Sequence, residues 1–169
     1  MKIFNILILI SIIPLVGVML LILIPGRYNS YCFNAALFIS SLTFILSLIM
    51  WLIFDSGHNS FQFLCTIDWL PAFNFYYTVG VDGISLFFLI LTTFLIMVCV
   101  LISWGSINYR LKEYLINFLL LEFLLIQVFS VLDLLLFYVF FESILMPMFL
   151  IIGIWGSRER KCSAAYQFF

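Results

Sequence analysis

The stretch FYVFFESILMPMF, residues 137–149, sets one carboxylate, Glu142, among apolar side chains, with Pro147 five positions later. An isolated charge in such a run costs free energy unless it is neutralised, paired or hydrated. What surrounds the stretch therefore decides what this acid is for.

The composition of the chain is that of a membrane protein. Its 169 residues are 66% hydrophobic and 9% charged, whereas a soluble domain has roughly 45–50% apolar and 25% charged residues. So few charges cannot make a water-facing surface, which excludes a soluble globular fold. Four scattered cysteines without a C-x-x-C pair predict neither a zinc site nor a disulfide framework.

Five apolar segments are each long enough to span about 30 Å of hydrocarbon, which takes roughly 20 helical residues. They predict an all-α integral membrane fold with one membrane domain over residues 1–169. The expected transmembrane helices are residues 3–24, 32–54, 84–103, 114–132 and 134–155. Residues 164–169 are expected to be the start of a truncated sixth helix, with a short surface helix as the alternative.

A long connection separates the second and third spans. Residues 61–79 hold two aromatic and β-branched runs around the breaker Trp69-Leu70-Pro71-Ala72, which predicts a β-hairpin at the membrane surface. Asp82 follows it and is either an N-cap of the third span or a solvated loop acid.

The basic residues predict the orientation of the chain. Six of the seven fall on one side of the predicted spans, and Lys2 alone falls on the other. By the positive-inside rule the basic loops face the cytoplasm or an organelle matrix. The N-terminus and the hairpin are then on the outer side. The six are Arg27, Arg110, Lys112, Arg158, Arg160 and Lys161.

Two acids lie inside the spans, Glu122 in the fourth and Glu142 in the fifth. A tight outer turn at Asp133 joins these spans, so they are antiparallel neighbours with both acids roughly 14–16 Å below the turn. A buried acid there can be neutral, paired with a cation, or set beside a hydrated path. Glu142 and Glu122 are therefore the candidate catalytic residues for carrying protons, and the alternative for each is a hydrogen bond that holds helices together.

Pro147 adds a second feature beside Glu142. Proline has no N–H, so the carbonyl of Ser143 loses its helical partner and a kink is expected. A carboxyl, a hydroxyl and a free carbonyl at one level could hold water.

Several motifs carry a resemblance to a known family. They are GVDGISL at residues 80–86, LDLLLF at 132–137, FYVFFESILMPMFLIIGIWG at 137–156 and WGSRERK at 155–161. With them the chain resembles the chain 4 family of mitochondrial NADH:ubiquinone oxidoreductase (respiratory complex I), antiporter-like membrane subunits, over its N-terminal third only. The resemblance is strong from residue 77 to 169 and looser before.

The resemblance implies a fold and a mechanism. The fold is the N-terminal part of an antiporter-like helical bundle, in which Glu142 and Pro147 match the family's F-F-E-x-x-x-x-P. There the glutamate pairs with a lysine on a broken seventh helix, which this chain lacks. The family translocates protons, while FMN, iron–sulfur clusters and quinone belong to other subunits, so no cofactor is expected on this chain. Glu122 matches an acid of the fourth helix in some members.

The expected function is a membrane-arm subunit of complex I, or the N-terminal fragment of a split one, that contributes to proton translocation in the mitochondrial inner membrane. The expected partners are other membrane-arm subunits, a second chain supplying the rest of the bundle, and lipids, but no nucleic acid. Two alternatives are a cation/proton antiporter subunit of the same superfamily and a non-translocating scaffold in the membrane arm.

Overall fold

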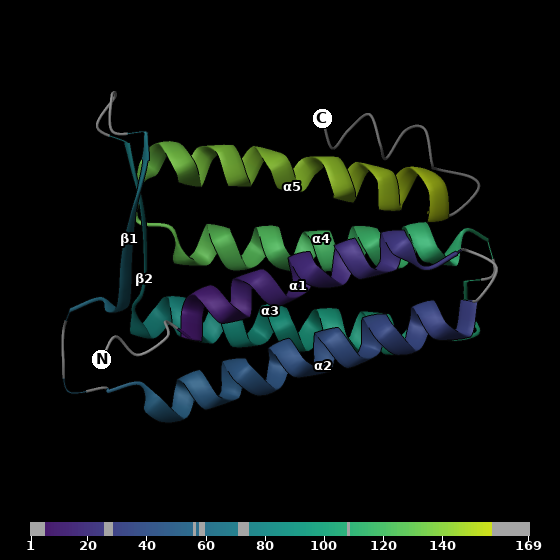
Figure 1. The fold of residues 1–169 in the computed structure, drawn as a ribbon, viewed down its shortest axis with the longest axis horizontal. Coiled ribbons are helices and arrows are strands. Elements are labelled where there is room, and N and C mark those ends of the chain that lie inside the picture. Colours follow the sequence, from purple (N-terminus) through teal and green to yellow (C-terminus); the bar gives the residue numbers. More distant parts are fainter. Residues whose placement is uncertain are drawn as a thin grey trace.

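The computed structural model describes residues 6–25, 29–55, 57, 60–70, 75–107 and 109–156. The described helices and strands are, in chain order, α1 (Ile6–Leu23), α2 (Asn29–Ile53), β1 (Gln62–Leu70), β2 (Phe75–Val81), α3 (Gly83–Ile102), α4 (Leu111–Ser130) and α5 (Leu134–Trp155). All five helices are long and apolar enough to cross a membrane. The predicted fold, five spans with a hairpin between the second and third, is confirmed (Figure 1).

The bounds of α1 and α3 agree with the prediction to within one residue over the described part of the chain, whereas those of α2 and α4 differ more. α2 and α4 begin at Asn29 and Leu111, three residues before the apolar runs suggested, because helical hydrogen bonding continues into polar residues at the ends of the spans. α4 ends at Ser130, two residues early, since Val131 turns extended and bridges to Val79 of β2. Residues 3–5 and 164–169 lie outside the described part of the chain.

α4 is the central helix of the bundle. It packs against α1, α2, α3 and α5, whereas α5 packs extensively against only one described helix, α4. Figure 1 accordingly shows α5 along one edge of the bundle. Among the described residues, no second helix covers the side of α5 that faces away from α4, and this side is called its open side below.

The hairpin closes one end of the helices (Figure 1). β1 and β2 are antiparallel, and Val79 and Val81 of β2 are buried in a cluster with Leu7, Met50 and Leu89 from three helices. Beside the hairpin, Asp82 caps α3, since its Oδ1 accepts a hydrogen bond of 2.8 Å from the backbone N–H of Ser85. Of the two alternatives predicted for Asp82, the N-cap is therefore confirmed and the solvated loop acid is wrong.

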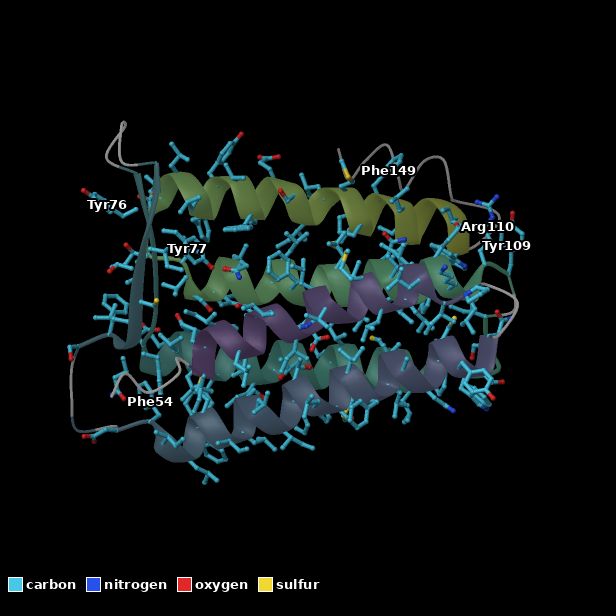
Figure 2. All side chains as sticks on the ribbon, in the orientation of Figure 1. Phe54, Tyr76, Tyr77, Tyr109, Arg110 and Phe149 are labelled. Atoms are coloured by element: carbon cyan, nitrogen blue, oxygen red, sulfur yellow. The ribbon has the colours of Figure 1, made fainter. Side chains whose placement is uncertain are left out.

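A tyrosine ties the hairpin to the central helix. Figure 2 shows Tyr77 on the bundle side of the strands and Tyr76 on the opposite side. The Tyr77 hydroxyl donates a hydrogen bond to Gln127 Oε1 of α4, and burial raises the pKa of the Tyr77 phenol, so it remains a donor at neutral pH. The backbone adds a second tie, because Leu132 N–H donates to the Thr78 carbonyl at 3.0 Å.

Tyr77→Phe is expected to loosen the hairpin by about 1 kcal/mol, the net value of one hydrogen bond. Hydrogen–deuterium exchange in detergent should show faster exchange of the β2 amides. Tyr76→Phe is the control, because the Tyr76 side chain is 47% exposed. Equal exchange in both variants would contradict the tie to Gln127.

Gly17 marks the closest approach of α1 to its neighbours. A Cβ built at Gly17 would lie 2.9 Å from side-chain atoms of Ile39 on α2 and 3.0 Å from Leu119 on α4. Small residues at such crossings let membrane helices pack by close contact.

Gly17→Val is expected to destabilise the bundle by about 1–3 kcal/mol, the usual cost of overpacking. The measurement is the midpoint of thermal unfolding of the assembled protein in detergent. Gly153→Val is the matched control, since no atom lies within 4 Å of a Cβ built there. Equal midpoints for the two variants would show that the α1 crossing can relax.

Candidate functional site

The two membrane acids lie at the same depth, as the sequence predicts. α4 ends at Ser130 and α5 begins at Leu134, so Glu122 is eight residues before the turn and Glu142 eight residues after it. At 1.5 Å per residue both lie about 12 Å from the ends of their helices. Asp133 fixes this turn, because its Oδ1 accepts a hydrogen bond of 2.8 Å from the N–H of Leu135.

The acids nevertheless occupy different environments. Glu122 is completely buried between helices and contacts α2. Glu142 is exposed on α5, among apolar residues that are also exposed, such as Tyr138 and Phe141. The two carboxyls therefore do not form one site within the described residues, a point that the sequence leaves open.

One oxygen of Glu122 is paired and the other is not. Thr43 of α2 places its hydroxyl 2.5 Å from Glu122 Oε1, and the two residues are 79 positions apart in the chain. Glu122 Oε2 is buried and has no hydrogen-bond partner among the described residues. An unpaired buried carboxylate oxygen is costly, so this geometry suits a proton-binding group more than a permanent anion.

Sequence reasoning missed Thr43, the partner of Glu122, and two buried serines on the same face of α2. Ser40, Thr43 and Ser47 lie on one face of α2 and are all buried. Their spacing of three and four residues in an apolar helix is the signal that could have found them. Ser47 extends the polar cluster to α3, since its Oγ lies 3.0 Å from the hydroxyl oxygen of Thr93.

A small cavity lies at the hairpin end of the bundle. Its volume is about 10 Å³, and its polar lining comes from Ser11, Tyr77, Gln127 and Ser130. This is at the lower limit of the space that one water needs. The polar groups of α1, α4 and β2 thus gather where the hairpin meets the helices.

Glu142 has a different kind of surroundings. No hydrogen bond or ion pair joins its carboxyl to another residue in the described part of the chain. Ser143, its neighbour, donates its hydroxyl to the Val139 carbonyl at 2.7 Å. Pro147 is buried within α5, which runs without interruption from Leu134 to Trp155, so the kink expected there stays a prediction.

The described basic residues lie at the end of the bundle opposite the hairpin. Figure 2 shows Arg110 there, and its guanidinium is 3.4 Å from the Glu113 carboxylate. Lys112 Nζ donates to the carbonyls of Ile22 and Ile24 at 3.0 and 2.7 Å, which satisfies the C-terminal end of α1. The other predicted basic residues lie outside the described ranges, and the sidedness of the chain stays a prediction.

No group of three His, Cys, Asp or Glu side chains within the described ranges could hold a metal ion. Cys32, Cys65 and Cys99 are free thiols. Within the described ranges, the carboxyls inside the spans are Glu122, which lies beside the Thr43 hydroxyl, and Glu142.

Comparison with known proteins gives a consistent result. Residues 131–169 match a family described as "NADH:quinone oxidoreductase/Mrp antiporter, TM". The chain is 63% identical over all 169 residues to NADH-ubiquinone oxidoreductase chain 4 of Chondrus crispus, and covers 34% of it. It is 53% identical over 156 residues, 92% of its length, to the protein of that name from Arabidopsis thaliana, of which it covers 32%.

A solved structure of respiratory complex I from Thermus thermophilus with bound NADH contains a similar chain. The TM-score is 0.77 at 28% identity, over 95% of this chain and 31% of that one. The chain thus spans about a third of the length of the curated relatives it matches.

Proposed function

Because this chain is homologous to about a third of NADH-ubiquinone oxidoreductase chain 4, we propose that it is a membrane-arm part of respiratory complex I and contributes to proton translocation. The observation that carries the proposal is the 63% identity to a chain 4 protein over all 169 residues. Two carboxyls at mid-depth in the spans support it, since acids in a membrane usually serve ion or proton paths.

Glu142 is the first proposed proton-carrying residue. Its carboxyl is on the open side of α5, where a helix from the rest of the bundle could bring a cation. The family resemblance implies a lysine there. When that lysine approaches, it favours the ionised carboxylate, and when it withdraws, the carboxylate takes up a proton. Glu142 would in this way couple the position of a charge to proton uptake.

Glu122 is the second proposed proton-carrying residue. It is fully buried and contacts α2 through Thr43, so it would exchange protons by a route separate from that of the exposed Glu142.

The redox chemistry would lie elsewhere in the complex. FMN, the iron–sulfur clusters and quinone would belong to other subunits, as the family resemblance implies, and this chain would carry no cofactor. Its partners would be other membrane-arm subunits, lipids, and the remaining two thirds of the bundle, on this polypeptide or a second one. The chain would lie in the mitochondrial inner membrane, with the hairpin and N-terminus toward the intermembrane space and the basic loops toward the matrix.

Two other functions each have one observation in their favour. The description of the matched family also names Mrp antiporters, which fits a cation/proton antiporter subunit. The hydrogen bond between Glu122 and Thr43 joins two helices, which fits a scaffold whose acids only hold the bundle together. The names of the relatives favour complex I over both.

The experiment that separates these functions compares two ways of driving proton movement in closed membrane vesicles containing the chain. The complex I function predicts a pH gradient that forms on NADH addition and is smaller when Glu142 is replaced by Gln. An antiporter would instead collapse an imposed pH gradient when sodium is added without NADH. A scaffold would tolerate replacement of both acids with no change in the NADH-driven gradient.

A further inference from the structure

The hydrogen bonds around Thr43 do not match the number of hydrogens available. Its hydroxyl oxygen lies 2.5 Å from Glu122 Oε1 and 2.9 Å from the carbonyl oxygen of Ser40. A threonine hydroxyl has one hydrogen and can donate to only one of these acceptors at a time. One hydrogen shared between two acceptors makes two weak bonds, whereas a hydrogen donated by another group would make both contacts full hydrogen bonds.

A neutral Glu122 supplies that hydrogen. Its carboxyl O–H can donate to Thr43 Oγ1, while the Thr43 hydroxyl donates to the Ser40 carbonyl, and both short contacts are then hydrogen bonds. An ionised Glu122 has no hydrogen to give, so the Thr43 hydroxyl must turn to the carboxylate and leave the Ser40 carbonyl. The charge would also leave Oε2, buried and without a partner, uncompensated.

We propose that Thr43 is a positioning residue for Glu122, whose hydroxyl turns between the Ser40 carbonyl and the carboxylate as Glu122 gains or loses a proton. The hydroxyl accepts a hydrogen bond from the neutral acid and donates one to the carboxylate, so the contact between α2 and α4 persists in both states. Any effect of Thr43 on proton pumping rests on the proposed function, whereas the hydrogen bonding between Thr43 and Glu122 does not depend on that function.

Two other buried hydroxyls, unlike that of Thr43, each contact a single acceptor among the described residues. Thr92 of α3 is 7% exposed and donates to the Phe88 carbonyl of its own helix at 2.7 Å. Ser130 of α4 likewise donates to the Ile126 carbonyl at 2.6 Å. These hydroxyls have one acceptor and one hydrogen, so no second donor is needed. Thr92 therefore supplies a control with the same side chain and similar burial.

The test is infrared spectroscopy of the intact complex, in which the carboxylic C=O band that is present in the wild type and absent in Glu122→Gln is assigned to Glu122. Thr43→Val, which keeps the side-chain shape and loses the hydroxyl, should move this band to higher frequency because a hydrogen bond is lost. Thr43→Ser should restore its position, and Thr92→Val should leave it in place. If Thr43→Val fails to assemble on a native gel, Thr43→Ala replaces it, since a smaller side chain cannot overpack the site.

Two results would overturn the proposal. One is that no carboxylic band disappears in Glu122→Gln, which would mean that the carboxyl is ionised at rest. The other is a band that does not move in Thr43→Val, or moves equally in Thr92→Val. A shifted band with unchanged protons per NADH would support the pair and refute instead the proposed use of Glu122 in translocation.

Discussion

Glu142→Gln is expected to leave the complex assembled and able to oxidise NADH, while fewer protons cross the membrane per electron pair. Glutamine has nearly the shape of glutamate but can neither ionise nor release a proton at this position. A cation that approaches the open side of α5 would then have no carboxylate to pair with. Its approach and withdrawal would therefore no longer cause release and uptake of a proton at position 142. The measurement is the number of protons translocated per NADH oxidised in closed vesicles.

Glu113→Gln is the control for this prediction. Glu113 is in the first turn of α4, where its 52% exposed side chain contacts the equally exposed Arg110, and an exposed pair of this kind contributes little. The same loss of one carboxylate at the end of a span should leave the proton number unchanged. An undiminished proton number in an assembled Glu142→Gln complex would exclude Glu142 from translocation.

Glu122→Lys is expected to prevent the chain from accumulating in the membrane. The side chain at this position is fully buried, and its one described polar contact is the hydroxyl of Thr43. An ammonium group there would be a buried charge without a counterion, at a cost of roughly 3 kcal/mol or more. The measurement is the amount of the chain in the membrane fraction and in the assembled complex, by immunoblot.

Glu122→Gln serves as the matched variant. The glutamine amide can donate a hydrogen bond to Thr43 Oγ1, as the neutral acid does, so the chain should accumulate and assemble, with a lower proton number if Glu122 carries protons. Normal accumulation of Glu122→Lys would mean that the site is open to water or to an anion, which contradicts the closed packing of α4 against α2.

Much of the fold follows from local features of the sequence. The five spans, the hairpin and the turn at Asp133 depend on hydropathy, β-propensity and capping, which short segments determine by themselves. The shared depth of Glu122 and Glu142 follows too, because the rise of a helix is constant.

The direction in which each acid points does not follow from the sequence. α4 and α5 are apolar around most of their circumference, so no polar stripe shows which side is buried. Packing decides it instead, since α4 is surrounded by helices and α5 lies at an edge. The partnership of Glu122 with Thr43 joins residues 79 positions apart, and a single sequence contains no signal for that pairing beyond the spacing of hydroxyls on α2.

The claim that this chain works within complex I is tested most directly by mass spectrometry of the NADH-oxidising band from a native gel of solubilised membranes. We expect peptides of this chain in that band, together with peptides from the rest of a chain 4 bundle that carries the proposed lysine partner of Glu142. Finding the chain only in bands without NADH oxidation would contradict membership of complex I. Finding it in the band without the rest of the bundle would contradict the role of Glu142 in translocation.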